Sequence, residues 1–220
     1  MSRTVSPPLL FLKLTLAVAC LFLPRLGYSG TDTRQDLVYI AGGVVGAFPE
    51  DHDAVFQNIS RSPTTIHAGV GLAVKVAVFP AITQRTVGLE LESMGHSGRI
   101  QFPISSGGMT QTGSSALTVF TTMANLLVQY PGSRLTPYAG VGLGWATGAL
   151  TGTNIPGRPD HELEGSSALS YQFLAGIRAH LNEHVFLFME YKRLATTFHW
   201  TQLALDFKAN YALVGFGYSF

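Results

Sequence analysis

The segment Asn210-Tyr211-Ala212-Leu213-Val214-Gly215-Phe216-Gly217-Tyr218-Ser219-Phe220 decides the fold class. Its even-numbered residues from Ala212 onward are apolar or aromatic, whereas most of the odd-numbered residues between them are small or hydroxylated. Successive side chains of a strand point to opposite faces, so this alternation predicts a β-strand with one strongly apolar face. Such a strand fits the wall of a closed barrel better than a helix fits it.

The same alternation recurs in seven earlier segments, at about residues 37–48, 64–79, 86–97, 115–130, 135–150, 168–180 and 185–195. In the clearest of them, 64–79, Ile66, Val70 and Val74 share one face, while Gly69 and Lys75 share the other. A helix would spread these residues around its circumference. Eight segments of this kind predict an all-β fold, an eight-stranded antiparallel up-and-down transmembrane β-barrel.

The connections between these segments alternate in length. Those at 80–85, 130–134 and 181–184 are short and rich in turn-forming residues, whereas those at about 49–63, 98–114 and 151–167 are long and polar. Short turns at one end and long loops at the other are typical of an outer-membrane barrel. The Ser-, Gly- and Thr-rich connection at 98–114 is predicted to be a flexible loop.

The composition limits the alternatives. Charged residues make up 12% of the chain and the formal net charge is +1, so the charge balance suggests neither nucleic acid nor an anionic surface as a partner. Hydrophobic residues make up 46%, yet after the N-terminal region no apolar run is long enough to cross a bilayer as a helix. The apolar surface must therefore lie inside a soluble sandwich or on the outside of a membrane barrel.

Residues 1–29 have the features of a secretory signal peptide. Arg3 and Lys13 precede an apolar core at 14–23, and small residues precede a cleavage position ahead of Gly30. The single cysteine, Cys20, lies within this segment, so the mature domain, residues 30–220, would contain no thiol and no disulfide. A lipoprotein processing site at Cys20 is the alternative, but the apolar run continues past it.

Six charged residues fall on the predicted inner face of the barrel: Lys75, Glu90, Glu92, Arg178, Glu190 and Lys192. Opposite charges in a medium of low dielectric constant must pair, because each unpaired charge there costs several kcal/mol. Eight strands leave an interior only wide enough for side chains. We therefore expect a salt-bridged plug surrounded by small residues and no wide pore, with a proton or ion path along these charges as the alternative.

Two segments resemble a known group of proteins. Residues 135–144 (LTPYAGVGLG) and 171–178 (YQFLAGIR), followed by Met189-Glu190-Tyr191 and the aromatic C-terminus, resemble the small outer-membrane barrel families that include OmpX, the Opa opacity proteins and the OmpA membrane domain. The resemblance implies the bacterial outer membrane and contact with its lipid and lipopolysaccharide. It also implies delivery to the barrel-insertion machinery, for which Phe216, Tyr218 and Phe220 would form the C-terminal insertion signal.

Proteins of these families serve as adhesins, immune-evasion factors and structural barrels, so the fold alone does not give the function. We expect a structural or surface-interaction role through the extracellular loops, with an unknown extracellular ligand. No catalytic residue, cofactor or nucleic-acid partner is expected.

Two alternatives remain for the function. The late strands are also similar to outer-membrane lipid A deacylases, in which a His-x-Ser pair with an acidic partner activates a hydroxyl. Here His199-Trp200-Thr201 offers a His-x-Thr spacing in what we expect to be the last loop. An amphipathic belt at the membrane surface is the simpler interpretation of His199 and Trp200. A narrow channel for small solutes is the other alternative.

Two of the long loops contain a histidine flanked by acidic residues. They read Glu50-Asp51-His52-Asp53 and Asp160-His161-Glu162, with Glu164 close by. Oxygen-rich clusters of this kind can hold a divalent cation such as calcium. Neither loop has the glycine and ligand spacing of a dedicated calcium motif, so we predict solvated loops and no metal site.

Overall fold

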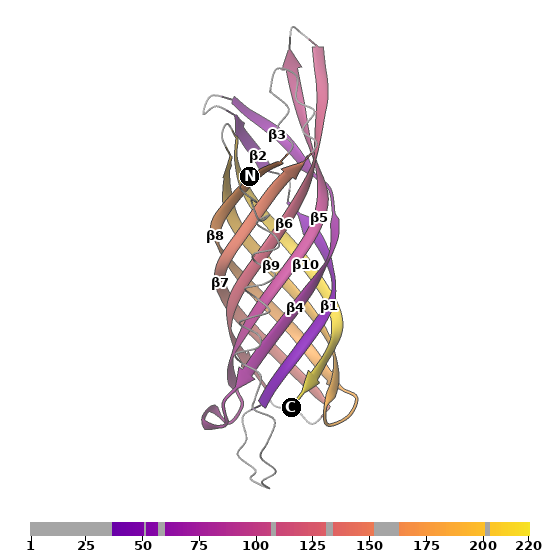
Figure 1. Ribbon diagram of the computed structural model, residues 1–220, viewed down its shortest axis with the longest axis vertical. Helices are drawn as coiled ribbons and strands as arrows, with labels where there is room; N and C mark the ends of the chain where they lie inside the picture. The colour runs from indigo at the N-terminus through magenta and orange to yellow at the C-terminus, as the bar shows by residue number, and fades with distance from the viewer. Residues whose placement is uncertain are drawn as a thin grey trace, which may run out of the picture.

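The computed structural model describes residues 37–50, 52–56, 60–106, 109–130, 134–151, 163–200 and 203–220. Eight long antiparallel strands form one closed barrel (Figure 1). They are β1 (Leu37–Pro49), β4 (Gly69–Phe79), β5 (Val87–Ser106), β6 (Met109–Gln129), β7 (Leu135–Thr151), β8 (Leu163–His180), β9 (Val185–Trp200) and β10 (Leu203–Ser219). The predicted fold class is confirmed. None of the described helical turns is long and apolar enough to cross a bilayer.

The barrel closes where β10 pairs with β1. The antiparallel ladder runs from Tyr39 opposite Ser219 to Pro49 opposite Ala209. Closure leaves no open strand edge in the wall, and in lipid each unpaired backbone group would cost several kcal/mol. The strand that we expected at 210–220 begins earlier, at Leu203.

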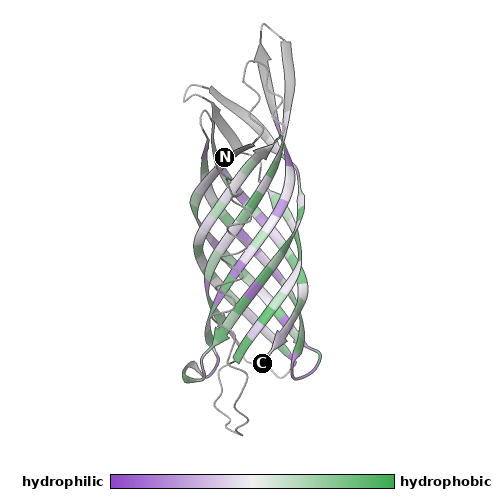
Figure 2. Cartoon of the chain, viewed as in Figure 1, coloured by the Kyte–Doolittle hydropathy of each residue, from purple (hydrophilic) through white to green (hydrophobic). Residues whose placement is uncertain are grey.

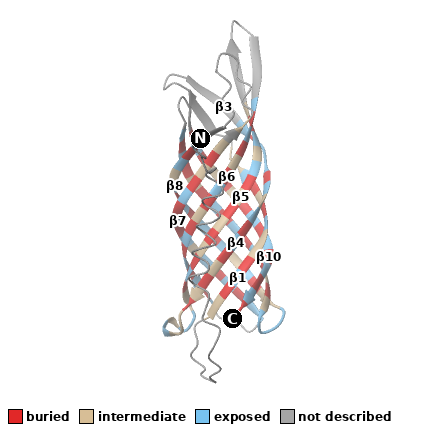
Figure 3. Cartoon of the chain, in the orientation of Figure 1, coloured by how far each residue is buried: buried red, intermediate tan, exposed pale blue. Residues whose placement is uncertain are grey.

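Buried and exposed residues alternate along the strands of the wall (Figure 3), and hydrophobic residues alternate with less hydrophobic ones along many of them (Figure 2). Val70, Leu72, Leu143 and Phe216 are among the exposed apolar residues of the outer face, each with at least 64% of its surface accessible. Apolar side chains at this exposure are costly in water and favourable against acyl chains. The outer face is therefore the lipid-facing surface.

The first long connection contains a hairpin. Strands β2 (His52–Phe56) and β3 (Ser60–Ile66) pair with each other, and they also pair with β10 and with β5 respectively. The single strand predicted at 64–79 is therefore wrong, because β3 and β4 are separate. His67 and Ala68 are both exposed, so the alternation slips by one residue and Ile66 lies buried instead of sharing the outer face of Val70.

The second long connection is also a hairpin. We expected a flexible loop at 98–114, but β5 and β6 stay paired from Gly98 opposite Leu117 to Ser106 opposite Met109. Threonine and serine on neighbouring strands support such a ladder despite their polarity. The hairpin extends above the barrel in Figure 1. Because its two strands are paired along this length, the prediction of a flexible loop is wrong.

The opposite end of the barrel has short turns. One contains the 3₁₀ turn η1 (Ala81–Thr83), followed by Gln84 and Arg85 in the left-handed backbone region at φ 53° and 56°. A residue with a Cβ costs about 1 kcal/mol in this conformation, whereas glycine adopts it freely.

We expect Gln84→Gly to raise the free energy of unfolding by about 0.5–1 kcal/mol, since relief of the left-handed conformation exceeds the entropy that glycine adds to the unfolded chain. Urea titration of the protein in lipid vesicles measures this difference. Thr83→Gly is the control and should destabilise, because the Thr83 hydroxyl contacts the carbonyl oxygens of Pro80 and Val87 at 2.9 Å each. A loss of stability for Gln84→Gly would contradict the argument.

Candidate functional site

Five of the six predicted interior charges meet in one cluster inside the barrel. Strand β4 contributes Lys75, β5 contributes Glu90 and Glu92, and β9 contributes Glu190 and Lys192. Lys75 lies directly opposite Glu92 in the β4–β5 ladder, whereas Glu190 and Lys192 of β9 contact Lys75 and Glu92 from across the barrel. All five residues are buried, with at most 4% of their surface accessible.

The two lysines of this cluster share the carboxylates between them. The Lys75 ammonium lies 2.9 and 2.8 Å from the two Glu190 oxygens, 3.4 Å from Glu92 and 3.8 Å from Glu90. The Lys192 ammonium lies 3.0 Å from Glu190 and also contacts Glu92. Each charge of this cluster therefore has an opposite charge within 4 Å, which offsets the cost of removing it from water.

Phenol and amide groups complete the shell of the carboxylates. Tyr39 donates a hydrogen bond to Glu90 at 2.7 Å, and Tyr138 donates one to Glu190 at 2.7 Å. Asn125 donates to the other Glu90 oxygen at 2.9 Å and accepts a hydrogen bond from Gln172 at 2.8 Å. None of these four residues was predicted as part of the site, although the alternation along their strands places Tyr138, Asn125 and Gln172 on the inner face.

Arg178 lies inside the barrel but apart from this cluster. Its guanidinium carbon is 4.5 Å from the ring centre of Tyr138, 4.7 Å from that of Tyr39 and 5.1 Å from that of Phe79. Among the described residues Arg178 forms no ion pair, and its Nε and Nη2 atoms make no hydrogen bond. Cation–π contacts thus replace the salt bridge that we expected for Arg178. Its charge balances the excess of carboxylates over ammonium groups in the cluster.

Large aromatic rings fill the interior on either side of the charges. Phe79 and Phe186 lie buried at the short-turn end, and Phe198 and Phe207 pack at 5.7 Å between ring centres toward the long-loop end. The prediction that only small residues surround the charges is therefore wrong, because large aromatic rings also fill the interior. Glycine makes room for the rings: a Cβ on Gly88 would lie 2.5 Å from the Phe79 ring.

The residues of the deacylase alternative are not gathered into a site. His199 lies on β9, not in the last loop as we predicted, and its side chain is exposed. Its backbone N–H donates to the Ser166 hydroxyl at 2.9 Å. No carboxylate contacts the His199 ring among the described residues, and Thr201 and the Trp200 side chain lie outside them.

The candidate metal loops are only partly visible. Glu50 forms a surface ion pair with Arg193 at 2.9 Å. The side chains of His52, Asp53 and Glu164, together with Asp51 and residues 160–162, lie outside the described part. Within that part, no three His, Cys, Asp or Glu side chains are grouped as a metal site would require. Residues 1–29, with Cys20, also lie outside it.

The C-terminal aromatic residues lie on the outer wall. Phe216, Tyr218 and Phe220 are exposed to 64%, 43% and 44%, and the rings of the last two are in edge contact at 5.1 Å. His184, in the neighbouring short turn, stacks on Tyr218 at 5.4 Å. These side chains lie open on the lipid-facing surface near the short-turn end; their role as an insertion signal remains a prediction.

The closed barrel and its apolar outer wall agree with the comparisons to known proteins. Residues 15–220 match the family described as "Outer membrane protein beta-barrel domain". The chain belongs to this family. Membership of this family confirms the expected location, the bacterial outer membrane. No curated protein matches the sequence.

Solved structures of outer-membrane β-barrels share the fold. OprG from Pseudomonas aeruginosa superimposes with a TM-score of 0.57 at 15% identity, over 85% of this chain and 97% of OprG. The neisserial surface protein NspA gives 0.51 at 11% identity, over 83% and 97% of the two chains. At these identities the similarity extends to the barrel architecture alone.

Proposed function

We propose that this protein is a non-catalytic outer-membrane barrel with a structural or surface-interaction role, in which the long-loop end meets an extracellular ligand. The observation that supports this most strongly is the filled interior. Lys75 and Lys192 form ion pairs with three glutamates there, and Phe79, Phe198 and Phe207 occupy the space on either side. A lumen filled in this way stabilises the wall and leaves the outer ends of the strands to make contacts.

The two paired hairpins support a role at the long-loop end. Strands β2 and β3 attach to the edges of β10 and β5, while β5 and β6 stay paired up to Ser106 and Met109. Paired backbone holds a recognition surface in place at a lower entropy cost on binding than an unpaired loop.

Shortening the β5–β6 hairpin tests this role. Replacing residues 102–113 by a two-residue turn removes equal lengths from both strands, so the pairing register of the barrel is kept. We expect the shortened barrel to fold normally and to lose adhesion of expressing cells to immobilised matrix proteins and glycans. Unchanged adhesion for this variant and for a matching deletion of β2 and β3 would contradict the proposal.

A narrow channel is tested by conductance. Because the charges are paired and the rings fill the space around them, we expect no discrete current steps in planar bilayers. A large porin in the same bilayers gives the positive control. Reproducible steps that change on Lys75→Met would favour the ion path instead.

A lipid A-modifying enzyme is the second candidate, supported only by the His-x-Thr spacing at His199. Mass spectrometry of lipid A from cells with and without the protein separates the two candidates. We expect identical acyl patterns. A chain lost or gained, and restored to the original pattern by His199→Ala, would favour the enzyme.

A further inference from the structure

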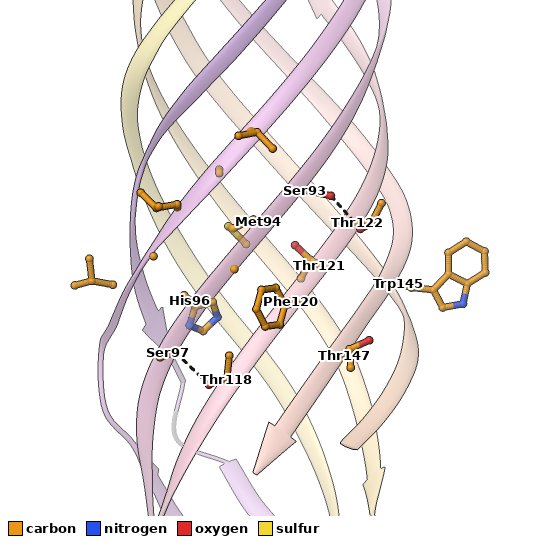
Figure 4. Close-up of a pocket in the computed structure, with 16 residues that line it drawn as sticks. Ser93, Met94, His96, Ser97, Thr118, Phe120, Thr121, Thr122, Trp145 and Thr147 are labelled. Carbon is orange, nitrogen blue, oxygen red and sulfur yellow. Dashed lines mark hydrogen bonds between the residues drawn. The ribbon is translucent and has the colours of Figure 1, made fainter. Parts of the chain in front are cut away.

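The outer wall is hollowed over β4, β5 and β6. Ser93, Gly95 and Ser97 of β5 form a row of small outward residues, and the β4–β5 ladder places each beside a branched apolar residue of β4. On the other side lies Phe120 of β6, whose ring covers Gly95 so closely that a Cβ there would be 2.6 Å from it. Trp145 of β7 closes the far edge and points away from the barrel in Figure 4. The cavity holds about 510 Å³, within the usual range of ligand sites.

This trough is chemically suited to an acyl chain. Its rims are apolar and open, with Val70 exposed to 71%, Leu72 to 69% and Trp145 to 61%. The serine hydroxyls of its floor already have hydrogen-bond partners on β6. Ser93 is hydrogen-bonded to Thr122 at 3.1 Å, and Ser97 is hydrogen-bonded to Thr118 at 3.1 Å. An occupant therefore meets methyl and ring surface and gains by dispersion contacts, not by hydrogen bonds.

A basic cleft continues the trough toward the long-loop end. This second cavity, of about 470 Å³, shares Ser97 with the trough and is lined by His67, Arg99 and Gln101. His67 and Arg99 are exposed on the outer face, and no acidic residue lines the cleft among the described residues. The Arg99 guanidinium makes no hydrogen bond or ion pair with any described residue. It is thus a cation placed at the rim with its donors available to an anion.

We propose that this trough and cleft together bind one phosphorylated glycolipid of the outer leaflet, with an acyl chain over Gly95 and a phosphate against Arg99 and His67. Ser93 and Arg99 are about 20 Å apart along the strand. The apolar floor and the cation therefore follow one another in the same order as the tail and the headgroup of an amphiphile. The trough and the cleft lie toward the long-loop end of the barrel, which is the side where the phosphates of lipid A lie. Arginine binds phosphate bidentately, which gives the headgroup orientation as well as affinity.

Trp145 provides the readout. The chain contains two tryptophans, so Trp145 alone fluoresces in a Trp200→Phe background. The protein is reconstituted into phosphatidylcholine vesicles that carry a small fraction of lipid A with brominated acyl chains, which quench a tryptophan on contact. We expect quenching several-fold above that caused by brominated phosphatidylcholine at the same fraction.

Two pairs of variants locate the binding. Arg99→Gln should weaken the lipid A preference on the order of ten-fold, as expected for the loss of a charge-assisted contact, while Lys208→Gln on β10 should leave it unchanged. Ser97→Leu fills the trough and should abolish the preference, whereas Ala212→Leu, outward on β10, should not. Both leucines face lipid, where apolar substitutions are tolerated.

Three outcomes would overturn the proposal. The first is equal quenching by lipid A and phosphatidylcholine. The second is equal quenching by lipid A with and without its phosphates. The third is a preference that Arg99→Gln leaves intact in a barrel shown to be folded by its slower migration before heating in gel electrophoresis.

Discussion

Glu190→Leu is expected to lower the free energy of unfolding by about 3–5 kcal/mol, because it removes the nearest carboxylate of the buried Lys75 ammonium and one of the two carboxylates that contact Lys192. Glu190 lies within 3.0 Å of both Lys75 and Lys192 and also accepts the Tyr138 hydrogen bond. Its removal leaves two ammonium groups to share the carboxylates of β5, neither of which is as close to Lys75. Urea unfolding in lipid vesicles gives the difference directly.

Two comparisons make this prediction specific. Glu50→Gln breaks the surface ion pair with Arg193, whose side chain is 54% exposed, so it should cost less than about 1 kcal/mol. The double variant Lys75→Met, Glu190→Leu removes a cation and an anion together and should recover most of the loss. If Glu190→Leu were no worse than Glu50→Gln, the buried cluster would not contribute to stability as described.

Gly215→Val is expected to prevent closure of the barrel. Gly215 lies opposite Gly43 where β10 meets β1, and a Cβ at 215 would lie 2.6 Å from the Gly43 Cα and 2.7 Å from the Phe188 ring. The strands would have to separate, and separated backbone groups in lipid cost several kcal/mol. We expect a loss of at least about 3 kcal/mol, seen as a greatly reduced folded fraction after refolding into vesicles.

Gly42→Val is the matched control at the same seam. A Cβ at 42 has its nearest neighbour, the Ala73 carbonyl oxygen, at 3.5 Å, which is ordinary contact. Valine there suits a strand and should change stability by less than about 1 kcal/mol. Equal folding of the two variants would show that the close approach at Gly215 is not needed for closure.

Strand parity carried most of the fold prediction. Because side chains alternate strictly, the apolar residues of 86–97 were enough to place Glu90 and Glu92 on the inner face, where they lie. Parity gives the face but not the height at which a side chain from one strand meets one from a distant strand. That height depends on the tilt and stagger of the whole barrel.

Arg178 illustrates this limit. It was expected to pair with an acidic residue, but the stagger of the strands places it beside Tyr39, Tyr138 and Phe79 instead. The hairpin of β2 and β3 escaped prediction for a different reason. Its few apolar residues show no clear alternation, and its pairing with β5 and β10 comes from the free edges that those longer strands offer.

The same hairpin determines where this wall tolerates a change in chain length. Since β3 is held in register by β5 and β2 by β10, adding a single residue within either strand would turn every side chain beyond it to the opposite face. Inserted residues, such as an epitope tag, should therefore be tolerated in the turn between β2 and β3. Within either strand, only insertions of an even number of residues should be tolerated. Surface variation in this family member would be confined by the hydrogen-bond ladder and not by exposure alone.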